Sequence, residues 1–298
     1  MNLWEDSRLD PGIRKGMIEA GADRVLPLPP DVDTVAKKQV WINSLEAAMA
    51  TRPPRGDGVP EHLEQQIETR QWTVQGPDGN EVLLMMKRPK RSGSQVLPCM
   101  YHTHGGGMCM MSMLDKSFQS LYSTLVAEGG ICVIGVEFRN SAGGLVYGPD
   151  APPAPFPKGL NDCFAGLRYV CENKAQLGVG TVVVGGESGG GNLAIALALK
   201  AAREEPDPAS PMIAGVYAMC PYISGTYAPA PATLPSLTEN ANYLGGFENA
   251  AVQAMADVYT AGGSGDHLDA LAWPLRASDA ELQRMPPHGA HYWHPCRQ

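Results

Sequence analysis

The sequence is short of several features that would assign it to other classes of protein. No uninterrupted apolar run approaches the length of a membrane-spanning helix, and the first residues, MNLWEDSRLDPG, lack the apolar region of a signal peptide. The formal net charge of −8 has the wrong sign for binding nucleic acid. The seven cysteines are scattered, with no C-x-x-C pair, which is typical of reduced core thiols. We therefore expect a cytoplasmic protein with no membrane span and no nucleic-acid partner.

The sequence also has little that indicates a metal or a bound polyanion. His102-x-His104 has a spacing found among metal ligands, but no cysteine or carboxylate stands at ligand spacing beside it. The only dense run of positive charge, Lys87-Arg88-Pro89-Lys90-Arg91, follows a predicted strand and is predicted to be a solvated turn. We expect no metal and no cofactor.

What the sequence does contain is an alternation of strand-like and helix-like segments. The 298 residues include 44% hydrophobic and 18% charged residues, enough for one large α/β domain or two small ones. The predicted strands are 67–75, 81–87, 96–103, 131–136, 181–184 and 212–219, and the predicted helices are 37–50, 117–129, 158–174 and 191–199. This order predicts an α/β fold with a mostly parallel sheet flanked by helices. Residues 1–60 are predicted to form an N-terminal helical cap, 61–288 the core and 289–298 an atypical tail.

The segment 181–199, TVVVGGESGGGNLAIALAL, is predicted to be a buried strand, a tight turn and a helix. Residues 186–190 of the turn fit the pattern G-x-S-x-G, with Ser188 at the centre. A serine at such a corner adopts a strained backbone conformation and stands at the carboxyl end of the sheet, above a helix N-terminus that favours a developing oxyanion. A competing interpretation is the dinucleotide fingerprint G-x-G-x-x-A at 189–194, but that fingerprint normally opens its domain, whereas several strands precede it here.

A second motif favours the interpretation of Ser188 as a nucleophile over the dinucleotide fingerprint. His104-Gly105-Gly106-Gly107 follows the predicted strand 96–103 directly. Consecutive glycines after a strand leave main-chain N–H groups free to face a substrate oxygen, because no side chain blocks the approach. HGGG followed later by G-x-S-x-G has the order that is required in hydrolases with a serine nucleophile on a strand-to-helix turn.

Together the two motifs resemble the hormone-sensitive-lipase-like family of α/β-hydrolases, of the microbial carboxylesterase type. The segments 135–140 (GVEFRN), 156–162 (FPKGLND) and 271–275 (LAWPL) are also similar to family segments, and the resemblance covers about 57–288. It implies Ser188 as the nucleophile. It implies that Gly106, Gly107 and Gly189 supply the N–H groups of the oxyanion hole, with His104 and Gly105 supporting their loop.

The resemblance does not extend to the end of the chain. The family's acid usually follows the strand that begins near 286–288, and its histidine comes later, but here the chain continues GAHYWHPCRQ and stops. Asp279 with His291 would need an unusual local rearrangement, and His294 has no obvious partner, so the triad acid and base are unknown. We expect a carboxyl-terminal truncation that removes the last strands. The strand 212–219 would then be left as an unpaired edge that promotes aggregation.

The resemblance implies a carboxylic ester hydrolase that cleaves short-to-medium acyl esters through a Ser188 acyl-enzyme, with a small-molecule ester as partner and a homodimer left open. Without acid and base, only the roughly 10³–10⁴-fold acceleration from the oxyanion hole and binding would remain. The alternative is a catalytically dead protein on the same scaffold that binds a small ligand, as the plant gibberellin receptors do.

Overall fold

The computed structural model describes residues 10–19, 26–51, 59, 61–144, 151–204, 212–229, 232–233, 235–239, 247–261 and 266–291. Within these residues the helices are α1 (Pro11–Glu19), α2 (Val35–Ala50), α3 (Glu61–Glu64), α4 (Lys116–Gly129), α5 (Lys158–Glu172), α6 (Lys174–Leu177), α7 (Gly189–Glu204), α8 (Ser236–Glu239), α9 (Asn249–Tyr259) and α10 (Asp279–Leu282). None of the helices described is both long enough and apolar enough to cross a lipid bilayer.

The strands form one seven-stranded sheet in the order β1-β2-β4-β3-β5-β6-β7. Their bounds are β1 (Ile67–Gln75), β2 (Glu81–Pro89), β3 (Leu97–Thr103), β4 (Cys132–Val136), β5 (Val179–Glu187), β6 (Gly215–Met219) and β7 (His288–His291). The predicted hairpin is confirmed, because β1 pairs antiparallel with β2. β2 also pairs antiparallel with β4, and the remaining neighbours are parallel, as the alternation of strands and helices predicted.

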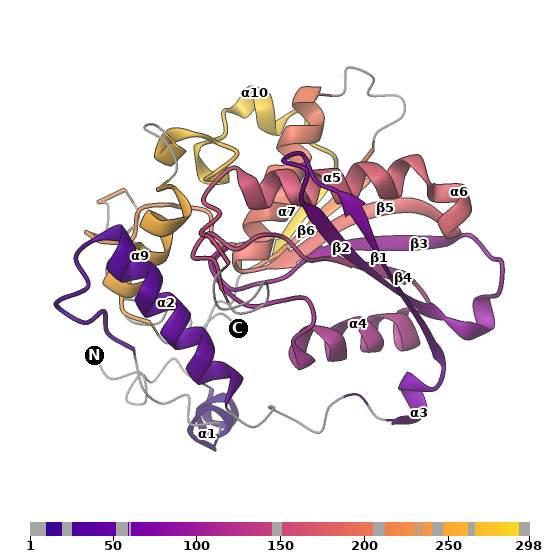
Figure 1. Ribbon diagram of the computed structural model, residues 1–298, viewed down its shortest axis with the longest axis horizontal. Coiled ribbons are helices and arrows are strands. Elements are labelled where there is room, and N and C mark those ends of the chain that lie inside the picture. The colour runs from indigo at the N-terminus through magenta and orange to yellow at the C-terminus, as the bar shows by residue number, and fades with distance from the viewer. Residues whose placement is uncertain are drawn as a thin grey trace.

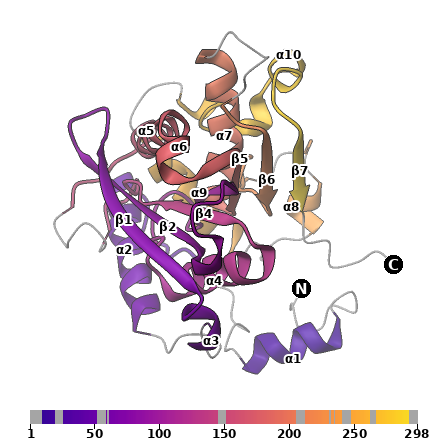
Figure 2. The ribbon, with the colours of Figure 1, turned by 90° about the vertical axis from the view of Figure 1, so that its right-hand side faces the viewer.

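Helices cover both faces of this sheet (Figures 1 and 2). α4 packs on one face, against β2 and β4, and α5 and α7 pack on the other. Because both faces are covered, the central strands carry apolar residues on both sides, and every residue of β4 is buried. The core therefore consists of two apolar layers with the sheet between them, which holds the carboxyl ends of β3, β4 and β5 in fixed positions.

The edge of the sheet differs from the expectation. The sequence predicted that 212–219 would be an unpaired edge, and this was wrong: β6 pairs in parallel register with β7, from Val216 opposite His288 to Met219 opposite His291. The resemblance placed the beginning of a strand near 286–288, but the residues of β7 include no β-branched residue, so its conformation follows from pairing with β6 rather than from propensity. The boundary predicted after residue 288 falls inside β7, and the rest of the predicted tail, 292–298, lies outside the described residues.

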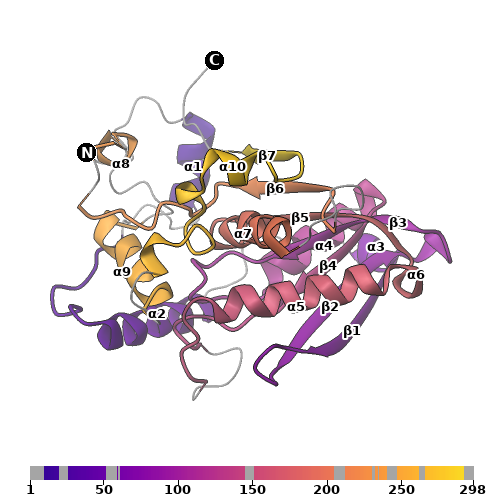
Figure 3. The same cartoon turned by 90° about the horizontal axis from the view of Figure 1, so that it is seen from above.

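The N-terminal helix α2 packs beside α9, a helix far from it in the sequence, and both lie beyond the carboxyl ends of the parallel strands (Figures 1 and 3). The hydroxyl of Thr34 caps α2 by accepting a hydrogen bond from the N–H of Lys37. The Lys38 ammonium forms an ion pair with Asp257 of α9. This arrangement places α2 over the end of the sheet where an active site would lie, and the description of 1–60 as a cap stays a prediction.

The basic run 87–91 begins inside β2 and is divided between core and surface, and the prediction of a solvated turn was wrong for Lys87 and Arg88. Lys87 is buried, and its ammonium donates to the hydroxyl of Ser123. Arg88 is also buried, and its guanidinium donates to the carbonyls of Leu177, Gly93 and Gln95. Arg88 thereby satisfies loop carbonyls at the amino-terminal end of the sheet, a structural role that leaves only Lys90 and Arg91 exposed.

Candidate active site

The predicted strand–turn–helix around Ser188 is present. β5 ends at Glu187, α7 begins at Gly189, and Ser188 between them has a φ of +53°. A non-glycine residue in the left-handed region is strained by roughly 1–2 kcal/mol, and the turn is held by hydrogen bonds on both sides. The Ser188 N–H donates to the carbonyl of Met219 at 2.9 Å, and the Ser188 carbonyl accepts from the N–H of Tyr222 at 3.0 Å. The end of β6 and the residues after it therefore fix the backbone of Ser188.

The glycines beside Ser188 allow main chains to pack at distances that a side chain would prevent. A methyl group added at Gly190 would lie 2.0 Å from the carbonyl oxygen of Thr103, and one at Gly186 would lie 2.4 Å from the carbonyl of Gly190. The Thr103 hydroxyl donates to the carbonyl of Gly190 at 2.7 Å. The start of α7 is thus fastened against the end of β3, where the HGGG segment begins.

The HGGG loop lies directly against the first residue of α7. A methyl group at Gly189 would lie 2.7 Å from the main-chain N of Gly107 and 2.6 Å from that of Met108. Gly106 and Gly107 have φ values of +103° and +62°, which turn the chain back toward the helix. Neither N–H, of Gly106 or of Gly107, donates a main-chain hydrogen bond to a residue that the structure describes. The structure therefore brings the three predicted oxyanion residues together beside Ser188.

The segment 108–111, which follows the glycines, is held by hydrogen bonds to three residues outside the loop. Met108, with a φ of +59°, has its carbonyl bonded by both the N–H and the hydroxyl of Ser141. Met111, with a φ of +72°, donates its N–H to the carboxylate of Glu46 at 2.7 Å and accepts from the Asn140 amide at 2.8 Å. Glu46 and Asn140 could not be predicted as supports of this loop, because nothing in the local pattern of α2 or of the segment after β4 shows that they meet at residue 111.

His104 is enclosed beneath the loop and is fully buried. Its ring stacks on Phe138 with centroids 4.1 Å apart and planes 9° apart, and its Nδ1 lies 2.9 Å from the carbonyl oxygen of Gly105. Burial lowers the pKa of His104 to about 4, so the ring is neutral at pH 7. These contacts agree with the expected supporting role and leave His104 no path to act as a proton carrier for Ser188.

Glu187 immediately precedes Ser188 and is partly buried, which raises the pKa of its carboxyl group. Its Oε1 lies 3.2 Å from the position that a methyl group on Gly105 would take. Glu187 therefore borders the HGGG loop beside the elbow, and it has no assigned chemical step.

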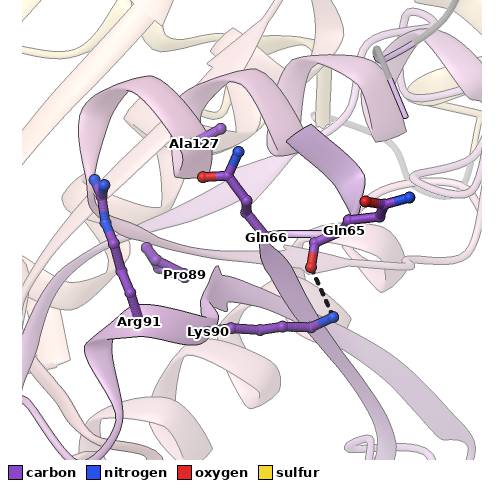
Figure 4. Close-up of a pocket in the computed structure, with 6 residues that line it drawn as sticks. All are labelled: Gln65, Gln66, Pro89, Lys90, Arg91 and Ala127. Carbon is purple, nitrogen blue, oxygen red and sulfur yellow. Dashed lines mark hydrogen bonds between the residues drawn. The ribbon is translucent and has the colours of Figure 1, made fainter. Parts of the chain in front are cut away.

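A cavity of about 280 Å³ lies at the opposite end of the sheet (Figure 4). Its lining comes from the turn between α3 and β1, the last residue of β2 with the 3-10 turn that follows it, and the last turn of α4: Gln65, Gln66, Pro89, Lys90, Arg91 and Ala127. Lys90 crosses its mouth and donates to the carbonyl of Gln65 at 2.8 Å. Because this lining holds no nucleophile and faces away from the carboxyl ends of the strands, the cavity is separate from the candidate active site. The described residues contain no group of three or more His, Cys, Asp or Glu side chains placed to hold a metal ion.

Comparison with known proteins agrees with this geometry. A family profile described as alpha/beta hydrolase fold matches residues 100–289, which include both the HGGG loop and Ser188. The chain belongs to the alpha/beta hydrolase family.

Among curated members of this family, the chain is 30% identical over 193 residues to the carboxylesterase NlhH of Mycobacterium tuberculosis, covering 64% of this chain and 54% of the relative. It is 28% identical over 130 residues to the hormone-sensitive lipase of Bos taurus, covering 43% of this chain and 15% of the relative. The chain thus spans about half the length of the first curated relatives it matches.

Solved alpha/beta hydrolases superpose on nearly the whole chain. Brefeldin A esterase, described as a bacterial homologue of human hormone-sensitive lipase, is 34% identical with a TM-score of 0.84, covering 96% of this chain and 77% of that one. The esterase Est22, solved with p-nitrophenol, is 29% identical with a TM-score of 0.74, covering 96% and 81%. The resemblance to the hormone-sensitive-lipase-like members is therefore confirmed.

An alpha/beta hydrolase needs an acid and a base that follow the nucleophile in the chain. Asp279 begins α10, which packs beside the last turn of α7 through the ion pair of Arg203 with Glu281. α7 has 16 residues and is about 24 Å long, and Ser188 precedes its first turn. Asp279 therefore lies at the end of α7 opposite Ser188, where it cannot act as the acid of a triad with Ser188. Asp269 is also near this end, with its Oδ1 3.8 Å from Nη1 of Arg203.

Three of the histidines that the structure describes lie where they do not supply the base. His102 and His104 are buried in the core, and His288 stands at the amino-terminal end of β7. The main chain of His291 pairs with that of Met219 at the end of β6, and the carbonyl of Met219 accepts the N–H of Ser188. The end of β7 is therefore separated from the end of β5, which carries Ser188, by β6 alone. His294 lies outside the described residues.

Proposed function

We propose that this chain is a serine carboxylesterase that cleaves short-to-medium acyl esters through an acyl-enzyme on Ser188. The observation that carries the proposal is the contact of Gly189 with the main-chain N atoms of Gly107 and Met108, beside a serine with a φ of +53°. Main-chain N–H groups from two segments converge next to one strained serine hydroxyl, which is the geometry that ester hydrolysis needs.

In this mechanism the Ser188 hydroxyl attacks the ester carbonyl carbon and forms a C–O bond while its proton passes to a base. The carbonyl oxygen becomes an oxyanion, and the N–H groups of Gly106, Gly107 and Gly189 stabilise it. Collapse of the tetrahedral intermediate breaks the bond to the leaving alcohol, which takes up the proton. Water then repeats the sequence on the acyl-enzyme and releases the carboxylic acid.

The base is the open element of the proposal. The end of β7 is the place to search, because its main chain adjoins Met219 and hence the turn of Ser188. His291 and His294 are the residues to substitute first. The competing function, a ligand-binding protein without turnover, would apply if no base acts on Ser188.

The acyl group would contact apolar side chains beside the loop. Met255 of α9 has its sulfur 3.2 Å from the position of a methyl group on Gly107, and it is buried with Met108 and Met110. A methionine-lined surface adapts its shape to flexible chains, which suits short-to-medium acyl groups. We place the enzyme in a reducing, cytoplasmic compartment, since Cys99, Cys109, Cys132 and Cys163 are buried free thiols.

The test is labelling of purified protein by a fluorophosphonate, with Ser188→Ala as the control, followed by hydrolysis of p-nitrophenyl esters of two to ten acyl carbons. Stoichiometric labelling that the substitution abolishes, with turnover highest for the shorter esters, supports the esterase. Absence of labelling in a folded sample contradicts it and favours the ligand-binding function, which equilibrium binding of small carboxylic acids would then examine. Light scattering of the same sample gives the oligomeric state.

A further inference from the structure

Two buried polar atoms face each other beneath the HGGG loop. Oε1 of Glu137 and Nε2 of His104 are 3.7 Å apart, and neither has a hydrogen-bond partner among the described residues. The exposed fractions of the two residues are 2% and 0%. A buried polar atom without a partner costs about 1–3 kcal/mol, so two such atoms in contact need an explanation.

The other atoms of the pair decide where protons can lie. Nδ1 of His104 is 2.9 Å from the carbonyl oxygen of Gly105, and because a carbonyl only accepts, Nδ1 carries the proton and Nε2 of the neutral ring presents a lone pair. Oε2 of Glu137 accepts from the hydroxyl of Ser112 at 2.7 Å and from the N–H of Met113 at 3.0 Å. Oε1 is therefore the carboxyl oxygen left to carry a proton toward Nε2.

We propose that Glu137 is a positioning residue that holds the oxyanion loop as a neutral carboxylic acid, with its proton on Oε1 and directed at Nε2 of His104. The proposal rests on the function proposed for Ser188, since the loop matters only if its N–H groups bind an oxyanion. Glu137 then fastens both ends of the loop: residue 104 through this proton, and residues 112 and 113 through Oε2. A movement of about 1 Å would bring Oε1 and Nε2 to hydrogen-bonding distance.

The surroundings of Glu137 favour the neutral acid over an ion pair. Burial raises the pKa of Glu137 to about 8, and burial lowers that of His104 to about 4, so neither charged form is favoured at pH 7. The ionisable groups near enough to interact electrostatically with Glu137 are the carboxylates of Asp115 and Glu46, the phenol of Tyr122 and the thiol of Cys163. No lysine or arginine in the described part of the chain forms an ion pair with it. An ionised Glu137 would thus add a third negative charge to a site without a cation.

This arrangement predicts a loss of stability on the alkaline side. The carboxyl pKa is higher in the folded protein than in the unfolded chain, so the folded state binds the proton more tightly and its stability falls as pH rises toward and through about 8. The two buried histidines, whose pKa values are lowered, act in the opposite direction and only below about pH 6.5. Buried thiols with raised pKa values, such as Cys109 and Cys163, also lower the stability as pH approaches 8.5, so the difference between the wild type and a variant without the carboxyl group isolates Glu137.

Glu137→Gln is the matched variant. Its amide oxygen can accept from Ser112 and Met113, while its NH₂ donates to Nε2 of His104 and does not titrate. We expect the urea midpoint of the wild type to fall more steeply between pH 6.5 and 8.5 than that of Glu137→Gln, in which only the thiols and other groups shared by both proteins contribute. The infrared difference spectrum of the two should contain a protonated carboxyl C=O band. Parallel midpoints, or a carboxylate band at pH 7, would overturn the proposal.

Fluorophosphonate labelling reports the loop itself. We expect Glu137→Gln to be labelled as fast as the wild type at pH 7 and faster at pH 8.5, and Glu137→Leu to be labelled roughly 100-fold more slowly, as for loss of an oxyanion donor. Equal labelling of Glu137→Leu and wild type would refute a positioning role. If the wild type is unlabelled at every pH, the esterase proposal fails, and the unfolding and infrared results still decide on the proton of Glu137.

Discussion

The carboxylate of Glu46 accepts the main-chain N–H of Met111 at 2.7 Å, which connects the N-terminal helix α2 to the loop that follows β3. Glu46 is buried, and Met111 has a φ of +72°. The hydrogen bond therefore restrains a strained residue four positions after the last glycine of the HGGG segment. Through it, the position of α2 becomes part of what defines the candidate oxyanion hole.

Substitution of Glu46 tests this connection. Glu46→Ala leaves the N–H of Met111 without its acceptor, which should lower the free energy of unfolding by about 1–3 kcal/mol. The rate of Ser188 labelling should fall roughly 10-fold, because the loop loses one of its supports. Glu46→Gln keeps an oxygen at the same place and should retain most of the rate. Equal labelling rates for Glu46→Ala and the wild type would show that α2 does not position the loop.

Gly190 tests the close packing of α7 on β3. A methyl group there would lie 2.0 Å from the carbonyl oxygen of Thr103, so Gly190→Ala should cost about 3 kcal/mol or more of folding stability. The control is Gly16→Ala in α1, where a methyl group meets nothing within 4 Å and should stabilise by roughly 0.5–1 kcal/mol. Chemical denaturation of both variants measures the difference. A stable Gly190→Ala protein would mean that the two main chains are further apart than described.

The strain at Ser188 can be separated from its chemistry. Ser188→Ala and Ser188→Gly should both abolish labelling, because each lacks the hydroxyl. Ser188→Gly adopts a φ of +53° without strain and should be more stable than Ser188→Ala by roughly 0.5–1 kcal/mol, after the larger entropy of unfolded glycine is counted. Thermal unfolding of the pair gives the comparison. The reverse order of stability would argue against a left-handed conformation at 188.

His102 should make the fold sensitive to acid. Burial, with a smaller contribution from His104, lowers its pKa to about 3, so the folded state binds fewer protons than the unfolded chain between about pH 3 and 6.5. The stability it contributes is present above pH 6.5 and is lost as pH falls, by about 2–3 kcal/mol at pH 4.5. His102→Asn can keep a hydrogen bond with Tyr122 and should make the fall of the urea midpoint over this range less steep, with His104, whose pKa is about 4, supplying part of what remains. An unchanged slope would assign the acid sensitivity to other groups.

The elements with strong local signals could be predicted from the sequence. The buried strand and the glycines around Ser188 specify the turn between β5 and α7, and the alternation in β1 and β2 specifies their hairpin. α9 was not predicted, because its residues lie in a long segment without a clear beginning or end signal, and packing against α2 stabilises it. β7 forms for a similar reason, through pairing with β6.

The supports of the candidate site were harder to predict. His104 could be assigned a structural role because it adjoins the glycines of its motif. Glu46 and Glu137 reach the same loop from α2 and from the end of β4, and only the folded chain shows that these segments meet. Local pattern indicates which main-chain groups are candidates to bind a substrate oxygen, whereas long-range packing specifies what keeps them in place.

The backbone of the turn also indicates how the sequence would drift over evolutionary time. Selection for a stable fold alone would keep glycine at 186 and 190, because the neighbouring main chains leave no room for a methyl group. The same selection would replace Ser188 by glycine or asparagine, which tolerate its left-handed conformation better. Invariance of the glycines among descendants of this chain would therefore record folding, and persistence of the serine would record a continuing use of its hydroxyl.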